Sequence, residues 1–177
     1  MSDIQAQIDR LTAIERRLNG GALTILPVIG ADLSAQIANR VISTGEDSQG
    51  GKFSPYSTKD GPAWWYFGRS ANAGGEAKVR AAAKKREGVS YSDFRLFNNR
   101  GVAEKNFFFR GEMWRGFGFK SVTYSGGVYT VILGGKTKDS ADRIGWMSAQ
   151  EGRSIIAPNM REKERAGESL LKFAING

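Results

Sequence analysis

The stretch FGFKSVTYSGGVYTVILGG, residues 117–135, carries the clearest structural signal in the chain. Its first half alternates with a period of two: Phe117, Phe119, Ser121 and Thr123 against Gly118, Lys120, Val122 and Tyr124. Such alternation is typical of half-buried strands, and two strand-like runs joined by Ser-Gly-Gly predict a β-hairpin. An antiparallel hairpin in a chain otherwise rich in helical patterns predicts an α+β fold.

Two apolar helical patterns precede the hairpin. In residues 3–18, Ile or Leu recurs at three- and four-residue steps, which predicts an amphipathic helix that Asn19-Gly20-Gly21 ends. Residues 23–44 repeat the pattern and predict a second, long helix, with Pro27 in its first turn and Gly45 at its end. The two helices form either a hairpin or an arm followed by a domain helix.

Further helices are predicted after the hairpin. The stretch 137–153 predicts a helix with Asp139 or Ser140 as its N-cap and Gly152 as its stop, and Asn159 caps a C-terminal helix. Strand character is expected for residues 94–101 and 105–135, and a short strand or bridge for 154–157. The resulting domain prediction is an N-terminal helix or arm at residues 1–21, followed by one α+β domain at 22–177 in which a long helix packs on the antiparallel sheet.

An aromatic and basic insertion is expected at about residues 60–93. Its four consecutive aromatic residues either stack on nucleic-acid bases, or they form a subunit interface or cover the sheet. The interface or covering role is favoured because the rings are not spaced along the backbone. The basic helix behind them contacts DNA phosphates or an acidic partner, or is simply a solvated face. The members of the two groups are Trp64, Trp65, Tyr66 and Phe67, then Lys78, Arg80, Lys84, Lys85 and Arg86.

The composition of the chain favours some classes of function and excludes others. The net charge of +8 and the pI near 9.9 favour contact with polyanions or acidic surfaces. The chain has no Cys and no His, which removes disulfides, thiolate zinc sites and the commonest catalytic base. No arrangement of the remaining residues suggests a catalytic, cofactor or metal site, so we expect a non-enzymatic protein. No run of 18 apolar residues is present, so no membrane contact is expected.

The loop GEDSQGGKFSPYSTK, residues 45–59, places Phe53 and Tyr56 between glycines and polar residues. Both rings are expected to anchor this loop on the sheet or a helix, and they are also candidates for a subunit interface together with the aromatic run.

The order of several short motifs resembles that of the tail-completion, or virion-morphogenesis, proteins of tailed bacteriophages. The motifs are the Gly-x-Asp-x-x-Gly-x-x-Phe-x-x-Tyr-Ser type of loop after a long helix, an Arg-Gly-x-Met segment before a hairpin, and a Glu-Gly end of a helix. The C-terminal segment keeps Pro158 but lacks the Arg-x-Phe-Leu core of the family. The matching residues are Gly45, Asp47, Gly50 or Gly51, Phe53, Tyr56, Ser57, Arg110, Gly111, Met113, Glu151 and Gly152.

This resemblance implies a structural virion protein at the neck of a tailed phage. Such a subunit joins head and tail by assembling as a homo-oligomeric ring, with portal-adaptor, neck or tail proteins as partners and packaged DNA nearby. The alternative is an accessory protein that binds nucleic acid through the basic helix and the aromatic run.

Overall fold

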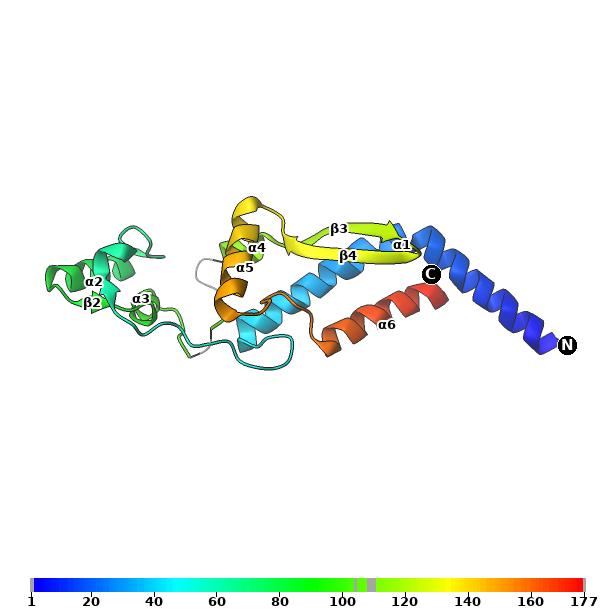
Figure 1. Cartoon of the computed structure of the whole chain (residues 1–177), viewed down its shortest axis with the longest axis horizontal. Coiled ribbons are helices and arrows are strands. Elements are labelled where there is room, and N and C mark those ends of the chain that lie inside the picture. Colours follow the sequence, from blue (N-terminus) through cyan, green and yellow to red (C-terminus); the bar gives the residue numbers. More distant parts are fainter. Residues whose placement is uncertain (1, 104, 108–110, 177) are drawn as a thin grey trace. The chain divides into compact units, whose positions relative to one another are not determined.

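The computed structural model describes residues 2–103, 105–107 and 111–176, and for Ser2 and Asp3 only the backbone. These residues form an α+β fold that divides into two compact units. Unit 1 comprises residues 1–39 and 113–177, and unit 2 comprises residues 40–112. The elements, labelled in Figure 1, are α1 Ser2–Thr44, β1 Gly61–Pro62, η1 Ala63–Tyr66, α2 Ala73–Lys84, β2 Gly88–Val89, α3 Tyr91–Phe97, α4 Glu112–Arg115, β3 Phe117–Ser125, β4 Val128–Gly135, α5 Lys138–Glu151 and α6 Met160–Asn176.

This division corrects the predicted domain boundaries. The arm and the long helix are one continuous helix, α1, and its last residues belong to unit 2. The 60–93 segment lies within unit 2, which is a compact unit of its own and not an insertion in a single domain. The sequence pattern could not show this, because compactness depends on which distant segments pack together.

α1 continues through the Asn19-Gly20-Gly21 stretch, where the first of two helices was expected to end. Gly20 and Gly21 lie inside the helix, and Pro27 is an interior residue, not a first-turn residue. Gly and Pro weaken a helix locally and commonly bend it. Figure 1 shows α1 changing direction between its dark-blue start and its lighter-blue remainder. The helix ends as predicted, because Gly45 follows it with a left-handed φ of 64°.

In unit 1 the hairpin packs on α1. The strands β3 and β4 pair antiparallel from Phe117↔Gly135 to Ser125↔Val128. Gly126 and Gly127 form the two-residue turn with φ of 58° and 82°, which only glycine adopts readily at both positions. The predicted hairpin and its turn are therefore confirmed. Gly30 of α1 lies so close to Phe119 and Val131 that a Cβ there would collide with both side chains.

A β-bulge between Phe119 and Ser121 changes which side chains face α1. The pairs Phe119↔Leu133 and Val122↔Val131 lie on the face toward the helix, whereas Ser121↔Ile132 lies on the opposite face. The simple alternation expected from the sequence placed Phe119 and Ser121 together and is wrong at this point. One extra residue in a strand reverses the faces that follow it.

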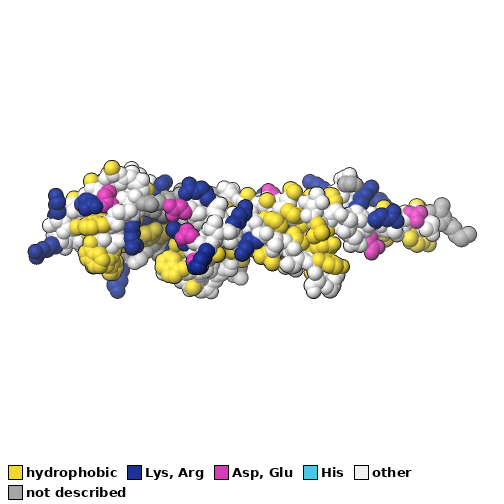
Figure 2. Space-filling view, turned by 90° about the horizontal axis from the view of Figure 1, so that it is seen from above, with side chains coloured by type: hydrophobic (Ala, Val, Ile, Leu, Met, Phe, Trp, Pro, Cys, Tyr) yellow, Lys and Arg dark blue, Asp and Glu magenta, His cyan; other side chains and the backbone are white. Residues whose placement is uncertain are grey.

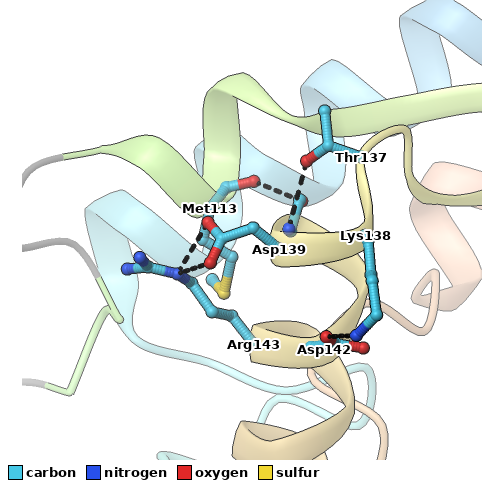
Figure 3. A network of polar contacts seen from close by, with 7 residues as sticks. Met113, Thr137, Lys138, Asp139, Asp142 and Arg143 are labelled. Carbon is cyan, nitrogen blue, oxygen red and sulfur yellow. Dashed lines mark hydrogen bonds and ion pairs between the residues drawn. The ribbon is translucent and has the colours of Figure 1, made fainter.

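α5 is fixed to the short helix α4 at its N-terminus (Figure 3). Thr137 caps α5 by accepting a hydrogen bond from Ser140 N at 3.2 Å, so the cap lies two or three residues before the predicted position. The Ser140 hydroxyl, 1% exposed, donates to the Met113 carbonyl at 2.9 Å. Arg143 pairs with Asp139 four residues earlier. The helix ends at Gly152, as the sequence predicts.

α6 begins at the cap that the sequence indicated. Asn159 Oδ1 accepts from Glu162 N, and Glu162 Oε2 accepts from Asn159 N, both at 2.8 Å. The ring of Phe173 in α6 occupies the space where Gly21 of α1 lacks a side chain. Residues 154–157, predicted as a short strand, form no strand, although Ile155 is fully buried.

Unit 2 is built around a small core of stacked rings and small residues. Its buried cluster consists of Ala63, Val79, Ala82, Val89 and Phe94. Residues 94–101 were expected to be a strand, but residues 94–97 belong to α3, because Ser90 and Asp93 form a capping box that starts a helix, and residues 98–101 form no strand. Residues 112–115, where strand character was also expected, form the short helix α4. The only sheet of this unit within the described residues is the two-residue pairing of β1 with β2.

Candidate interaction surfaces

Three large aromatic side chains are exposed in unit 2, two of them on η1 and one on the residue that follows it. Trp64, Trp65 and Phe67 are 64%, 49% and 39% exposed, and the two indole rings form an edge-to-face pair with centroids 6.1 Å apart. Tyr66 does not join them, since it stacks on Phe94 at 4.5 Å and belongs to the core cluster. Burial raises the pKa of Tyr66 above 10.0, with Tyr91 adding to the rise. The aromatic run therefore divides into an internal anchor and an exposed trio.

Glu76 joins the exposed aromatic trio to α2. Its carboxylate accepts from Gly68 N at 3.1 Å and pairs with Arg80 at 2.8 Å. The Arg80 guanidinium lies over the Phe67 ring at 4.8 Å, a cation–π contact. We call Trp64, Trp65, Phe67 and the exposed cations of α2 the aromatic–basic surface.

The five cations predicted for the basic helix do not form one row along α2, and two of them follow its last residue. Lys78 and Lys85 are seven residues apart and share one flank of the helix, whereas Arg80 and Lys84 lie on the other flank, beside Glu76. Arg86 follows the helix in a left-handed conformation with φ of 59°. All five are exposed, so the surface is broadly basic and presents no single row of charges.

Phe53 and Tyr56 lie inside unit 2, and this corrects their assignment to a subunit interface. Each is 5% exposed. Phe53 meets Phe107 edge to face at 4.9 Å. The Tyr56 hydroxyl accepts from the backbone N–H of Asn106 at 3.2 Å and of Phe107 at 3.1 Å. Both rings therefore hold the 45–59 loop to a distant part of the same unit, which is the anchoring role that the sequence also suggested.

Asp47 gives this loop its shape. The Asp47 carboxylate is 3% exposed and accepts from the backbone N–H of Gln49 and Gly51, both at 2.8 Å, and Gly50 has a φ of 82°. The Gly-x-Asp-x-x-Gly pattern therefore forms a turn that the Asp47 carboxylate stabilises through hydrogen bonds to the backbone. It binds its own backbone and is not placed as a ligand site.

Arg95 is the buried residue that sequence reasoning missed. It is 1% exposed, donates to the Gly101 carbonyl at 3.0 Å and lies over the Tyr56 ring at 4.1 Å. Burial raises the pKa of Tyr56 above 10.0, and Arg95 opposes that rise. Nothing local distinguishes this arginine from the exposed ones, apart from its place on the aromatic face of α3 beside Phe94.

In unit 1 the outer face of the hairpin is exposed and uncharged. It comprises Ser121, Thr123, Ser125, Val128, Thr130 and Ile132. Val128 and Ile132 are 62% and 38% exposed, and Tyr124 at the tip is 61% exposed. Figure 2 shows hydrophobic side chains gathered over this part of the molecule, with few charged ones among them.

The start of α1, which we call the arm (residues 4–15), also presents apolar side chains. Ile4, Ile8 and Leu11 are 71%, 49% and 66% exposed. Further along the same helix Leu26, Ile29 and Ile37 are buried, although Leu23 and Val28 stay exposed. By length and composition α1 could cross a membrane, since an 18-residue window within Ile4–Thr44 has a mean hydropathy of 1.4. A core helix passes the same test, and 33% of this window is buried inside the chain.

Comparison of the chain with protein-family models, curated proteins and solved structures gives no match. Within the residues that the structure describes, no three acidic side chains gather as a metal site would require. Of the motifs that resemble phage proteins, Gly111 takes a left-handed φ of 76° before α4, Met113 is buried, and Gly152 ends α5. Arg110 lies outside the described residues.

Proposed function

We propose that this protein is a structural subunit of a tailed-phage virion, a tail-completion or neck protein that joins head and tail by ring assembly. It works as a non-enzymatic component, assembled in the host cytoplasm and retained in the particle. Its partners are further copies of itself and the neighbouring portal-adaptor, neck or tail proteins. The order of the phage-like motifs along the chain supports this proposal.

The observation that carries the proposal is the amount of apolar surface that the chain leaves uncovered. Large hydrophobic side chains are exposed on α1, on η1, at the hairpin and on α6, where Met160 and Leu171 are 70% and 58% exposed. Single exposed apolar residues are ordinary, but several groups of them mark protein interfaces. A subunit with contacts on many sides is what a multivalent ring requires.

Deletion of the gene in the phage that encodes it tests the proposal. A neck or completion subunit is expected to leave DNA-filled heads and separate tails in the lysate, both visible by negative-stain electron microscopy. Expression of the chain in trans should restore joined particles, and mass spectrometry should detect it in purified virions. Normal joined virions from the deletion strain would contradict the proposal.

The aromatic–basic surface favours a second function, binding of single-stranded nucleic acid. Its exposed rings can stack on bases, and residues 59–100 carry nine Lys or Arg against four Asp or Glu. Fluorescence titration with a homopolymeric single strand tests this. Trp64→Ala with Trp65→Ala is expected to reduce affinity at least about tenfold, since each stacked base contributes about 1–3 kcal/mol. Trp146→Ala, which removes an exposed indole from unit 1, is the matched control. Absence of binding at low salt by the unaltered protein would exclude this function.

A further inference from the structure

The outer edges of the β3–β4 hairpin have no strand beside them. Within the described residues this sheet has two strands only, so β3 and β4 each direct a row of backbone N–H and C=O groups away from their partner. An isolated hairpin is marginally stable, and its groups at a free edge readily pair with another strand. The chemistry of such an edge selects a β-strand as its occupant.

The outer part of the hairpin, residues 121–135, lacks the features that usually protect an edge, whereas its base carries Lys120 and a bulge. Proteins protect exposed edges with charged residues, Pro or a bulge. Residues 121–135 contain no charged residue and no Pro, in a chain with 26 Lys or Arg and 18 Asp or Glu. The single register shift lies at Phe119/Ser121, at the base, and leaves the five outer pairs from Ser121↔Ile132 to Ser125↔Val128 regular.

We propose that β4 of one copy pairs antiparallel with β3 of the next copy, so that the hairpins form a continuous sheet through the assembly. This inference rests on the proposed function, and it names the partner of the free hairpin edges as a second copy of this chain. Val128 and Ile132 of each copy then lie beside side chains of the neighbouring hairpin on the same face of the sheet.

Charge and strand length both indicate a second copy as the occupant. Two chains that each carry +8 repel each other, and repulsion is smallest where they meet through a surface without charge. A polyanion would select the basic residues of unit 2 and not this face. Among the described residues, β3 and β4 are also the only strands longer than two residues, so a self-assembling chain offers no other strand of matching length.

The direction of pairing follows from ring symmetry. Copies in a cyclic ring have the same orientation, so β4 of one copy and β3 of the next run in opposite directions. This repeats the antiparallel pairing inside the hairpin. A two-fold contact would instead place β3 against β3, or β4 against β4, and would stop at a dimer.

The first experiment introduces charge on the hairpin. Thr123→Lys with Ile132→Lys changes two exposed side chains of the outer face and brings like charges together between copies. We expect the dissociation constant of the assembly, measured by sedimentation velocity, to rise at least about tenfold. Thr24→Lys with Gln150→Lys adds the same charge at exposed positions elsewhere in unit 1 and should assemble like the unaltered protein. Circular dichroism checks that each variant is folded.

The second experiment reads the direction of pairing through cysteines, for which the chain has no background because it contains none. A mixture of Thr123→Cys and Thr130→Cys proteins should form disulfides under mild oxidation, which need Cα atoms about 4.4–6.8 Å apart. Each variant alone should form far fewer, because equal positions of consecutive copies lie two strands, about 10 Å, apart. Equal cross-linking of Thr123→Cys with itself would overturn the head-to-tail pairing.

The outcomes separate this inference from the proposed function. Unchanged assembly of the Thr123→Lys, Ile132→Lys protein, or an unaltered protein that stays monomeric at high concentration, overturns hairpin pairing. Neither result affects the deletion phenotype, which tests the neck role. Normal joined virions without the gene would contradict the neck role even if the hairpins pair in solution.

Discussion

The two units of this chain differ in how many large hydrophobic side chains they expose. Of the sixteen large hydrophobic side chains exposed among the described residues, twelve belong to unit 1 and four to unit 2. Both units bury polar side chains, but those of unit 2 include the largest one, Arg95, together with Asp47 and Asn98, each at most 3% exposed. Unit 2 is therefore held by internal hydrogen bonds and ring contacts, whereas unit 1 leaves apolar surface for neighbours. Stability and assembly are expected to respond to mutations in different units.

Removal of Arg95 tests this contrast most strongly. Arg95→Ala leaves a cavity below the Tyr56 ring and removes the donor to the Gly101 carbonyl. The expected loss is about 3–5 kcal/mol of the free energy of unfolding of unit 2. Hydrogen exchange should show lost protection in residues 61–99 and unchanged protection in the hairpin.

The control for this change is Leu96→Ala on the same helix, whose side chain is 50% exposed, and it should cost less than about 1 kcal/mol. Equal loss of protection in both units after Arg95→Ala would mean that they unfold together and would remove the contrast.

In unit 1 the packing of α1 against the hairpin is tested at Gly30. A Cβ at this position collides with Phe119 and Val131, so Gly30→Ala is expected to cost about 1–3 kcal/mol. Gly20, in the same helix, has open space around its Cβ position, and Gly20→Ala should stabilise the chain by about 0.5–1 kcal/mol. Denaturant unfolding measures both. Effects of the same sign at the two positions would contradict the close contact at Gly30.

The buried hydroxyl of Tyr56 predicts a pH dependence confined to unit 2. Because burial raises its pKa in the folded state above 10.0, its stabilising contribution is complete below pH 10 and is lost as pH rises through the folded-state pKa. The free energy of unfolding, followed by hydrogen exchange in unit 2, should fall more steeply above pH 10 for the unaltered protein than for Tyr56→Phe. Parallel curves would show that Tyr56 ionises as easily in the folded chain as in the unfolded one.

The smallest effect on stability is expected from the arm. Leu11→Ala changes a side chain that is 66% exposed and should alter the free energy of unfolding by no more than about 0.5 kcal/mol. Ile37→Ala, in the buried part of the same helix, should cost about 2–5 kcal/mol. Thermal unfolding compares the two. A large loss of stability for Leu11→Ala in the isolated chain would mean that the arm is covered by contacts within it.

Local signals predicted local structure well and long-range structure poorly. The two glycines of the hairpin turn and the Asn159 cap lie where the sequence placed them, because a few neighbouring residues fix each feature. The break expected at Gly20-Gly21 was wrong because the Phe173 ring, from the far end of the chain, packs against Gly21. The glycine is explained by a close contact and not by a helix end.

The candidate surfaces show the same limit. The sequence identified the aromatic run but not that Tyr66 faces inward while Trp64, Trp65 and Phe67 face outward. That division depends on the ring of Phe94, which α3 holds against Tyr66.

The sequence alone determined the α+β class, the hairpin with its turn, the ends of α1 and α5, and the uncharged run at 121–135, because each depends on residues close together in the chain. Only the tertiary structure decided the division into two units, the burial of Arg95, the packing partners of Phe53 and Tyr56, and the face that the hairpin turns outward. A single bulge reversed that face. Its position depends on how the strands pack against α1, which no local pattern records.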